Sequence, residues 1–162
     1  MEEKMNQRIY KPVSASRTEQ AHIVVPQYAN GANYLFGGQL MQWVDEVAGI
    51  VGHRHCAGEV RTVAIDHMDF LSPTRINETV TVKGRITYAG CTSMEICVES
   101  YAETLDNPTQ PRLINRAYLT LVAVDPQGHP TPVPGLICET EAERADQQAG
   151  ERRAMLRKGQ SM

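Results

Sequence analysis

Hydrophobic residues recur at helical spacing between residues 37 and 52, and they define the strongest element that the sequence predicts. At about 100° per residue, six apolar side chains share one face of this helix, with Trp43 and Ile50 widening it. The six are Leu40, Met41, Val44, Val47, Ala48 and Val51. The polar residues opposite are Gln39, Gln42 and Glu46. A helix that is apolar over most of its circumference is normally enclosed, so we expect a central helix wrapped by other elements.

From residue 60 onward the hydrophobic period changes to two, which is typical of half-buried strands. The predicted strands cover residues 60–70, 79–87, 93–101 and 113–124. An earlier strand is expected over residues 21–25, where Pro26 ends it. A loop is expected over residues 105–111 and a β-turn over residues 125–128. This order of elements predicts an α+β fold, in which an antiparallel sheet packs on one long helix. Because one helix leaves a sheet edge and a sheet face uncovered, we expect at least a dimer.

The two ends of the chain are polar, and residues 1–18 are expected to be frayed. Between residues 139 and 158, acidic residues precede basic ones, an order that complements a helix dipole. We therefore predict a helical tail with a break at Gly150. No repeat or linker is evident. The expected organisation is a single domain over residues 1–162, with a core of residues 18–135 and a polar helical tail over residues 136–162.

Composition excludes several classes of protein. The chain has 162 residues and a net charge of −3, with no basic stripe for nucleic acid. Its N-terminus lacks the apolar segment of a signal peptide, and no run reaches the roughly 18 apolar residues that span a bilayer. We expect a cytoplasmic protein that binds neither nucleic acid nor membrane. The four cysteines form no CxxC pair, and His53 and His55 do not share a helical face, so no metal site is predicted.

Asp45 is the anomalous residue of the central helix, because it lies at the margin of the apolar face. Four small residues flank it on the helical wheel, and they leave room for a ligand or another backbone. They are Gly38, Ala48, Gly49 and Gly52. We expect the fold to desolvate Asp45, which would raise its pKa and mark a functional site. The alternative, with equal weight on the pattern alone, is a carboxylate held by a backbone amide or an arginine.

The segment AN-x-x-N-x-x-FGG-x-LM-x-W-x-DEVAG, followed by VRTVAIDHMDFLSP, resembles the hotdog-fold acyl-CoA thioesterases. Within them it is similar to the cytosolic long-chain acyl-CoA hydrolases. The resemblance covers residues 21–125 and includes GCTSM at residues 90–94 and the closing LTLVAVDPQG. It implies a hotdog fold, in which a curved antiparallel sheet wraps the central helix. It also implies a homodimer as the minimal unit and a trimer of dimers, a homohexamer, as the assembly.

The resemblance further implies an active site at the dimer interface, where Asp45 of one protomer faces Asn30 of the other. Asn33 is the alternative candidate for the loop asparagine that faces Asp45. An amide of Gly37 or Gly38, at the positive end of the helix dipole, would polarise the thioester carbonyl of acyl-CoA. Asp45 would then act as general base or as nucleophile, without a serine nucleophile. No cofactor is expected, since coenzyme A is part of the substrate and of the product.

For the coenzyme, the resemblance points to the turn that contains Gly90, Thr92 and Ser93, and more weakly to Thr62 at the thioester end. Three arginines are candidate phosphate partners, each weighed against an ordinary solvated strand residue. They are Arg61, Arg85 and Arg116. His67 and Asp69 alternate with Val63 and Ile65 on one face, and we expect them to be satisfied polar groups near an interface.

Two other functions are considered. Phe36 stands where some relatives have a histidine, which argues against the related dehydratases. A non-catalytic acyl-CoA-binding regulator on the same fold is the main alternative, because a fold does not fix the chemistry. Such regulators usually carry a DNA-binding segment, and this chain has neither the length nor the charge for one. Thiol release across a series of acyl-CoA substrates distinguishes the enzyme from the regulator.

Overall fold

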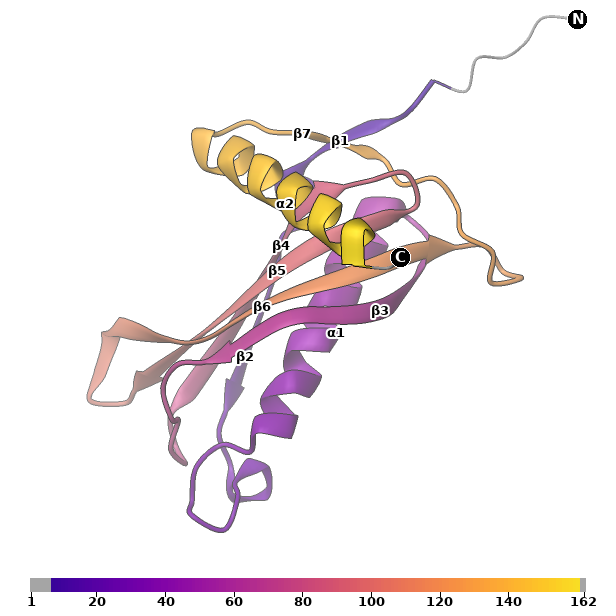
Figure 1. Ribbon diagram of the computed structural model, residues 1–162. Coiled ribbons are helices and arrows are strands. Elements are labelled where there is room, and N and C mark those ends of the chain that lie inside the picture. Colours follow the sequence, from indigo (N-terminus) through magenta and orange to yellow (C-terminus); the bar gives the residue numbers. More distant parts are fainter. Residues whose placement is uncertain (1–6, 161–162) are drawn as a thin grey trace, which may run out of the picture.

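The computed structural model describes residues 7–160, and its main element is a five-stranded antiparallel sheet with the strand order β2-β4-β5-β6-β3 (Figure 1). The strands are β2 (Thr18–Ile23), β3 (Glu59–Phe70), β4 (Thr79–Ala89), β5 (Ser93–Thr104) and β6 (Asn107–Val124). A second, two-stranded parallel sheet joins β1 (Tyr10–Pro12) to β7 (Gly135–Ile137). Short 3-10 helices occupy Val13–Ala15 and Pro26–Tyr28.

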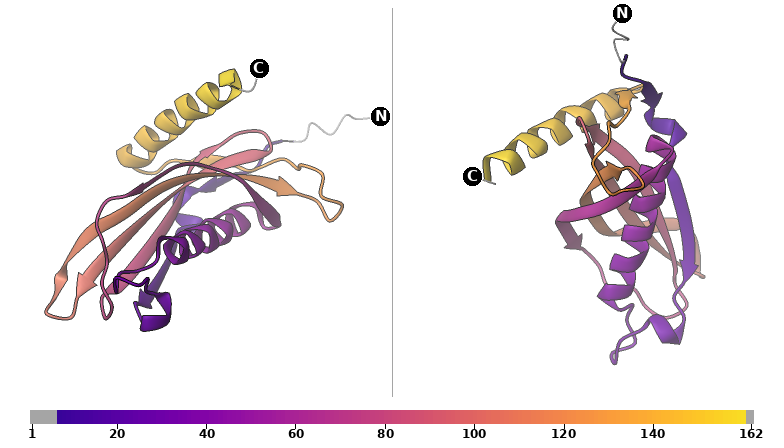
Figure 2. Two further views of the ribbon diagram at one scale, coloured as in Figure 1. Left: turned by 60° about the horizontal axis from the view of Figure 1, so that its bottom comes forward. Right: turned by 90° about the vertical axis from the view of Figure 1, so that its right-hand side faces the viewer.

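Two long helices lie on opposite faces of the curved sheet (Figure 2). Helix α1 (Gly37–Cys56) lies in the concave face, and helix α2 (Glu141–Gln160) lies over the convex face. The predicted α+β arrangement of one long helix against an antiparallel sheet is therefore confirmed. Within residues 7–160, no helix is both long enough and apolar enough to cross a bilayer.

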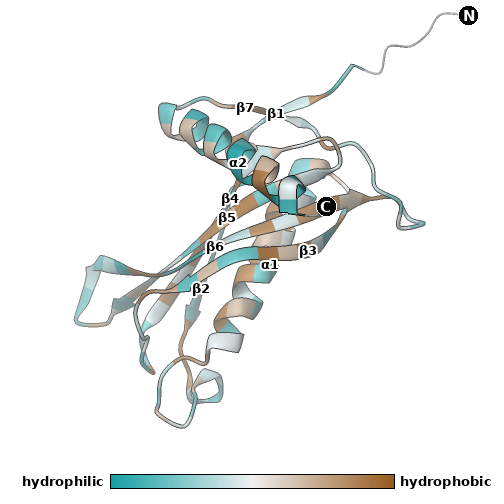
Figure 3. Ribbon diagram, in the orientation of Figure 1, coloured by the Kyte–Doolittle hydropathy of each residue, from teal (hydrophilic) through white to brown (hydrophobic). Residues whose placement is uncertain are grey.

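The hydrophobic core lies between α1 and the sheet, and Figure 3 shows hydrophobic positions recurring along both. Most of the predicted apolar face of α1 is buried, but Met41 is exposed and Ile50 is half-buried. The reason is that α1 packs against one sheet only, so its far side is open in the single chain. Gly84 allows the close approach of helix and sheet, since a Cβ there would lie 2.6 Å from Val47 Cγ1.

The ends of the elements differ from the prediction in several places. Residues 10–15 form β1 and a 3-10 helix, because β1 pairs with β7, which the hydrophobic pattern did not predict. The expected loop over residues 105–111 is mostly strand, since β5 and β6 continue into a long hairpin. The turn over residues 125–128 is present, with Gly128 N donating to Asp125 O at 2.9 Å and Gly128 at φ +85°.

Helix α2 continues through Gly150, so the predicted break there is wrong. Gly150 is instead a point of close contact, because a Cβ there would lie 2.7 Å from Tyr88 Cβ and 3.0 Å from Glu95 Oε1. The helix begins with a capping box, in which Glu143 N donates to Thr140 Oγ1 at 3.1 Å and Thr140 N donates to Glu143 Oε2 at 3.3 Å. The single-domain organisation stays a prediction.

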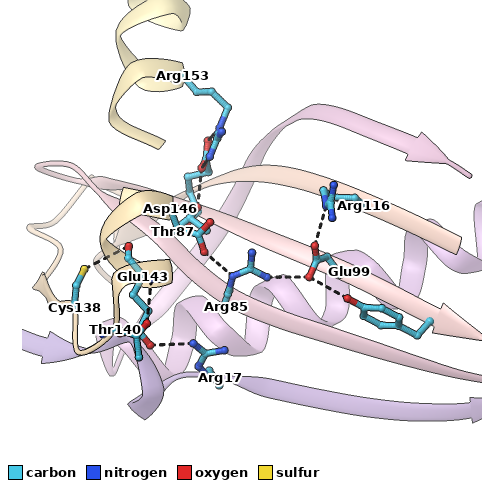
Figure 4. A network of polar contacts seen from close by, with 12 residues as sticks. Arg17, Arg85, Thr87, Glu99, Arg116, Cys138, Thr140, Glu143, Asp146 and Arg153 are labelled. Carbon is cyan, nitrogen blue, oxygen red and sulfur yellow. Dashed lines mark hydrogen bonds and ion pairs between the residues drawn. The ribbon is translucent and has the colours of Figure 1, made fainter. Parts of the chain in front are cut away.

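Charged side chains join α2 to the convex face of the sheet (Figure 4). Glu95 of β5 is 0% exposed and accepts two hydrogen bonds from Arg153, at 2.7 and 2.9 Å. Arg85 of β4 binds Asp146 of α2 at 2.8 Å and Glu99 of β5 at 3.1 Å. Pairing of this kind is what allows a carboxylate to be fully buried.

Two β-bulges shift the register of β3 against β6, one at Val63 and one at Asp66. Each bulge adds one residue, so the faces of β3 do not follow the simple alternation assumed from the sequence. Ile65 is paired with Leu119, a core residue, whereas His67 is paired with Tyr118, which faces Arg153 of α2. His67 and Ile65 therefore lie on opposite faces, and their predicted common face is wrong.

Candidate active site

Asp45 of α1 and Thr62 of β3 form a hydrogen-bonded pair at the open edge of the sheet. The Thr62 hydroxyl donates to Asp45 Oδ1 at 2.8 Å. Thr62 is paired with the core residue Leu121, which places it on the face of β3 toward α1. Thr62, the weaker of the predicted thioester contacts, thus holds the main candidate carboxylate.

The expected burial of Asp45 does not occur within one chain, where its side chain is exposed. The physical reason is the position of β3, which has a neighbouring strand on one side only. The trough beside Asp45 is open as well, because a Cβ added at Gly49 would have no atom within 4 Å. Desolvation of Asp45 therefore requires a second molecule.

The loop before α1 uses its two asparagines differently. Asn30 Oδ1 accepts hydrogen bonds from Ala32 N at 3.0 Å and from Tyr34 N at 3.2 Å. Its side-chain oxygen is occupied by the loop, and its amide group is left to donate. Asn33 has φ +64°, a left-handed conformation that asparagine adopts more readily than most residues. The structure thus gives Asn33 a role in the turn, whereas the side-chain nitrogen of Asn30 has no acceptor among residues 7–160.

Gly37 and Gly38 are the first two residues of α1, as the sequence predicts. The first helical hydrogen bonds come from Gln39 N and Leu40 N, both to Phe36 O, at 3.0 and 3.2 Å. Within residues 7–160, the amides of Gly37 and Gly38 donate to no acceptor. A Cβ at Gly38 would lie 2.5 Å from the ring of Phe36. Two unpaired amides at a helix start form a ready site for an oxyanion.

The glycine amides and Asp45 of one chain lie far apart. Asp45 follows Gly38 by seven positions, which corresponds to about 10 Å along the helix axis at the usual rise. No hydrogen bond joins Asn30 to Asp45 in the described part of the chain. A single thioester carbonyl therefore does not reach both groups within one protomer.

The candidate coenzyme turn lies between β4 and β5, and its carbonyls are bound by other segments. Val133 N donates to Cys91 O at 2.8 Å, and Ala123 N donates to Thr92 O at 3.0 Å. Arg8, which the sequence analysis missed, donates to Gly90 O at 2.5 Å and to Ala89 O at 3.3 Å. A groove of about 430 Å³ runs beside this turn. Within residues 7–160, the Thr92 and Ser93 hydroxyls form no hydrogen bond, so they are available to a ligand.

The register of the sheet places this turn near Thr62. Ser93 is paired with Val122, which is paired in turn with Arg61. Neighbouring strands are about 4.8 Å apart, so the start of β5 lies roughly 10 Å from the Arg61–Thr62 segment. The turn and the Asp45–Thr62 pair therefore share one end of the sheet.

The other candidate polar residues have different partners. Arg85 and Arg116 both bind Glu99, so they belong to the charged network of the sheet. Arg61 binds the exposed Glu59 at 3.2 Å. His67 and Asp69 pair with each other at 2.9 Å on the exposed edge strand. None of the hydrogen bonds that histidines form within residues 7–160 reaches Asp45 or Asn30.

Two of the four cysteines, Cys56 and Cys97, are unsuited to nucleophilic attack. Burial raises the pKa of the Cys56 thiol to about 11, and burial likewise raises the pKa of Cys97 to about 11. Both thiols are therefore protonated at neutral pH, and neither is an activated nucleophile. No group of three metal-ligating side chains occurs within residues 7–160.

Comparison with known proteins identifies the family of the chain. A model of the thioesterase superfamily matches residues 32–108. An uncharacterized acyl-CoA thioester hydrolase of Bacillus subtilis is 36% identical over 152 residues, which cover 91% of this chain and 88% of that protein. The chain belongs to the acyl-CoA thioester hydrolase family. The hotdog resemblance stated from the sequence is thereby confirmed.

A vertebrate member of the family is also similar. The cytosolic acyl coenzyme A thioester hydrolase of Rattus norvegicus is 35% identical over 147 residues. The match covers 90% of this chain and 39% of the rat protein. The similarity to the cytosolic type of hydrolase is confirmed at this level of identity.

Solved thioesterases share the fold closely. An acyl-CoA hydrolase of Staphylococcus aureus in complex with coenzyme A has a TM-score of 0.90 at 31% identity, covering 95% of this chain and 92% of that one. That hydrolase was solved with an asparagine, an aspartate and a threonine each replaced by alanine, and these positions are 15 and 17 residues apart. Asn30, Asp45 and Thr62 have the same two separations. A hexameric acyl-CoA thioesterase without ligand also has a TM-score of 0.90, at 32% identity, covering 94% of this chain and 97% of that one.

Proposed function

We propose that the protein hydrolyses acyl-CoA thioesters to a free fatty acid and coenzyme A, at a site shared by two protomers. The observation that carries the proposal is the 2.8 Å hydrogen bond from Thr62 to Asp45, which fixes an exposed carboxylate at an open sheet edge. A carboxylate in this position can accept a proton from water or attack a carbonyl carbon. The family of the chain supplies the substrate class.

The proposal places the two halves of the site on different chains. Because Gly38 and Asp45 are about 10 Å apart along one helix, the amides of one protomer act with Asp45 of the other. Val63 and Ile65 are exposed apolar residues of β3, whose outer edge has no neighbouring strand in the described chain, as expected of a surface that pairs with a second copy. The minimal unit is a homodimer, and three dimers form a homohexamer, in line with the hexameric relative.

The reaction follows from the positions of these groups. The amides of Gly37 and Gly38 and the side-chain amide of Asn30 donate hydrogen bonds to the thioester oxygen, which becomes negative as the carbonyl is attacked. Asp45 removes a proton from water, the water oxygen bonds to the carbonyl carbon, and the carbon–sulfur bond breaks. The thiolate leaves and takes up the proton, giving coenzyme A and a carboxylic acid. Thr62 orients the carboxylate throughout.

Direct attack by Asp45 is the second route to the same products. Its oxygen bonds to the carbonyl carbon, the thiolate leaves, and water then hydrolyses the resulting anhydride. Neither route uses a cofactor, and coenzyme A enters only as part of the substrate. The Thr92 and Ser93 hydroxyls bind the coenzyme portion, and Gly90 shapes their turn through the hydrogen bond from its amide to Ser93 O at 2.8 Å. The cytosolic rat relative supports a cytoplasmic location.

The proposal is tested by thiol release with a chromogenic thiol reagent. Asp45→Asn keeps the shape of the side chain and removes its basicity, so kcat should fall about 100-fold or more. Asn30→Ala should also lower kcat, because a donor to the oxyanion is lost. Glu46→Gln is the matched control, since Glu46 is the next residue of α1 and its carboxylate binds only Gln42 in the described chain, at 2.9 Å. It should retain wild-type activity.

Two results would overturn the proposal. Near wild-type turnover by folded Asp45→Asn protein would remove Asp45 from the mechanism. Tight binding of acyl-CoA without thiol release at any chain length would identify a non-catalytic regulator instead.

A further inference from the structure

A cavity of about 400 Å³ opens beside Asn30 and Gly37, at the start of α1. Its apolar walls come from the loop before the helix, from the helix itself and from the end of β3. They include Leu35, Leu40, Phe70 and Leu71. The volume lies in the range of small-molecule sites, roughly 300–1,000 Å³. A cavity of this kind next to two groups of the candidate active site has room for part of the substrate.

The charge of the residues that line the cavity indicates which part of the acyl-CoA substrate it holds. Among the described residues that line it, none carries a formal charge. The groove beside the Gly90 turn differs, because Arg8 is among the residues that line it. The phosphates of coenzyme A are anionic and require donors or cations, whereas an acyl chain is neutral and requires apolar contact. The cavity therefore suits the acyl chain.

The walls of the cavity are fixed by hydrogen bonds. Leu35 N donates to Thr74 O at 2.7 Å, which ties the loop before α1 to the loop after β3. Arg112 donates to Pro73 O at 2.8 Å and to Ser72 Oγ at 3.2 Å, and it also pairs with Glu78. Leu71 N donates to Ile114 O at 2.8 Å. A pocket held in this way discriminates by shape, because its walls do not move aside for a longer ligand.

We propose that this cavity is the acyl-chain pocket and that Leu71 and Phe70 determine which chain lengths are accepted. The proposal rests on the hydrolase function proposed above. With the thioester carbonyl at the amide of Gly37, the acyl chain extends into the cavity while the coenzyme extends away from it. Leu40 is 4% exposed and forms the inner wall, whereas Leu71 is 53% exposed and lies at the rim. Substitution at the rim changes the space for the chain without disturbing the core.

The test is the dependence of kcat/KM on acyl chain length for Leu71→Trp. The larger side chain fills the cavity, so kcat/KM for long-chain substrates should fall at least tenfold more than kcat/KM for acetyl-CoA. The matched control is Leu105→Trp, the same substitution in the β5–β6 hairpin, where Leu105 is 79% exposed. Its chain-length profile should equal that of the wild type. A wild-type profile for folded Leu71→Trp would overturn the proposal.

Phe70→Ala supplies a second variant of opposite effect. It enlarges the cavity, so the ratio of kcat/KM for long to short acyl chains should rise. An unchanged ratio would also contradict the proposal. These outcomes are separate from failure of the proposed function, because that failure is seen in the wild type and in Asp45→Asn. If activity depends on Asp45 but the chain-length profile does not change on substitution of Leu71 or Phe70, the proposed function stands and the proposed acyl-chain pocket is wrong.

Discussion

The hydroxyl of Thr62 donates a 2.8 Å hydrogen bond to the carboxylate of Asp45, across the gap between the edge strand β3 and helix α1. The β-bulge at Val63 follows directly after Thr62, and the residues beyond it are shifted by one position relative to β6. Because bulges re-aim side chains next to active sites, we interpret Thr62 as a positioning residue for the carboxylate. It sets the direction in which Asp45 presents its free oxygen.

Replacement of Thr62 tests this relationship. Thr62→Val keeps the shape of the side chain and removes the donor, so kcat should fall by about 10- to 100-fold, the value of a hydrogen bond to a charged group. Thr62→Ser retains the hydroxyl and should keep most of the activity. Steady-state kinetics of both variants checks the expectation. Equal activity of Thr62→Val and the wild type would show that the hydrogen bond has no part in turnover.

Asn33 should be dispensable for catalysis. Its φ of +64° calls for a residue that tolerates the left-handed conformation, and glycine does so without strain. Asn33→Gly should leave kcat/KM within about twofold of the wild type, while Asn33→Ala should lower the free energy of unfolding by about 1–2 kcal/mol. Urea denaturation and thiol release measure the two effects. A loss of activity in folded Asn33→Gly comparable to that of Asn30→Ala would reverse the assignment of the asparagines.

Gly150 should be required for the docking of α2. A methyl group there would lie 2.7 Å from Tyr88 Cβ, so Gly150→Ala should lower the free energy of unfolding by about 1–3 kcal/mol. Gly159→Ala is the matched control in the same helix, where an added Cβ meets nothing within 4 Å. Because alanine favours a helix, Gly159→Ala should be neutral or stabilising by up to about 1 kcal/mol. Equal stability of the two variants would contradict the close contact of α2 with β4.

Acid should weaken the attachment of α2 through Glu95. Burial alone would raise the pKa of Glu95, but hydrogen bonds from Arg153 and Thr87, with the charges of Arg153 and Arg157, lower it below 4.5. A lowered pKa stabilises the folded state above the pKa of the unfolded chain, and this stability is lost as the pH falls through the folded value. Unfolding free energy should therefore decline on acidification below about pH 4.5.

The variant Glu95→Gln tests this contribution. It should lower the free energy of unfolding at neutral pH by about 3 kcal/mol, since it leaves Arg153 without its charged partner. Its acid decline should also be shallower than that of the wild type. An identical pH dependence in urea denaturation would show that Glu95 does not carry the effect.

Local patterns predicted much of the fold. The 3.6-residue period placed α1 correctly, and the period of two placed β3 to β6, because both reflect burial against the same core. The convex face was harder to predict, since its partners are distant charged residues such as Glu95 and Arg153, which no hydrophobic pattern connects. The capping box of Thr140 and Glu143 was a readable signal for the start of α2 that the sequence analysis did not use.

The sequence predicted where the candidate residues lie on α1 better than it predicted their solvent exposure. Asp45, Gly37 and Gly38 lie on α1 as expected, but Asp45 is exposed in the single chain. Burial of a residue at an interface depends on a second protomer, and the sequence carries no local signal for it. The hydrogen bond from Thr62 to Asp45 was not predicted, because it joins residues of two different elements that no local pattern connects. Arg8 lies outside the quoted motifs, and only the folded chain brings it to Gly90.

The shared site is tested most directly by mixing two inactive variants, Asn30→Ala and Asp45→Ala, in one oligomer. A mixed dimer has one site that lacks both residues and one site that retains both. Random assembly at equal amounts of the two chains should therefore recover about a quarter of the wild-type activity, because an isologous dimer contains two equivalent sites. This recovery is the expected result, measured by thiol release after co-expression or co-refolding. Activity no greater than the sum of the two separate variants would place Asn30 and Asp45 in the same protomer's site and contradict a site shared by two protomers.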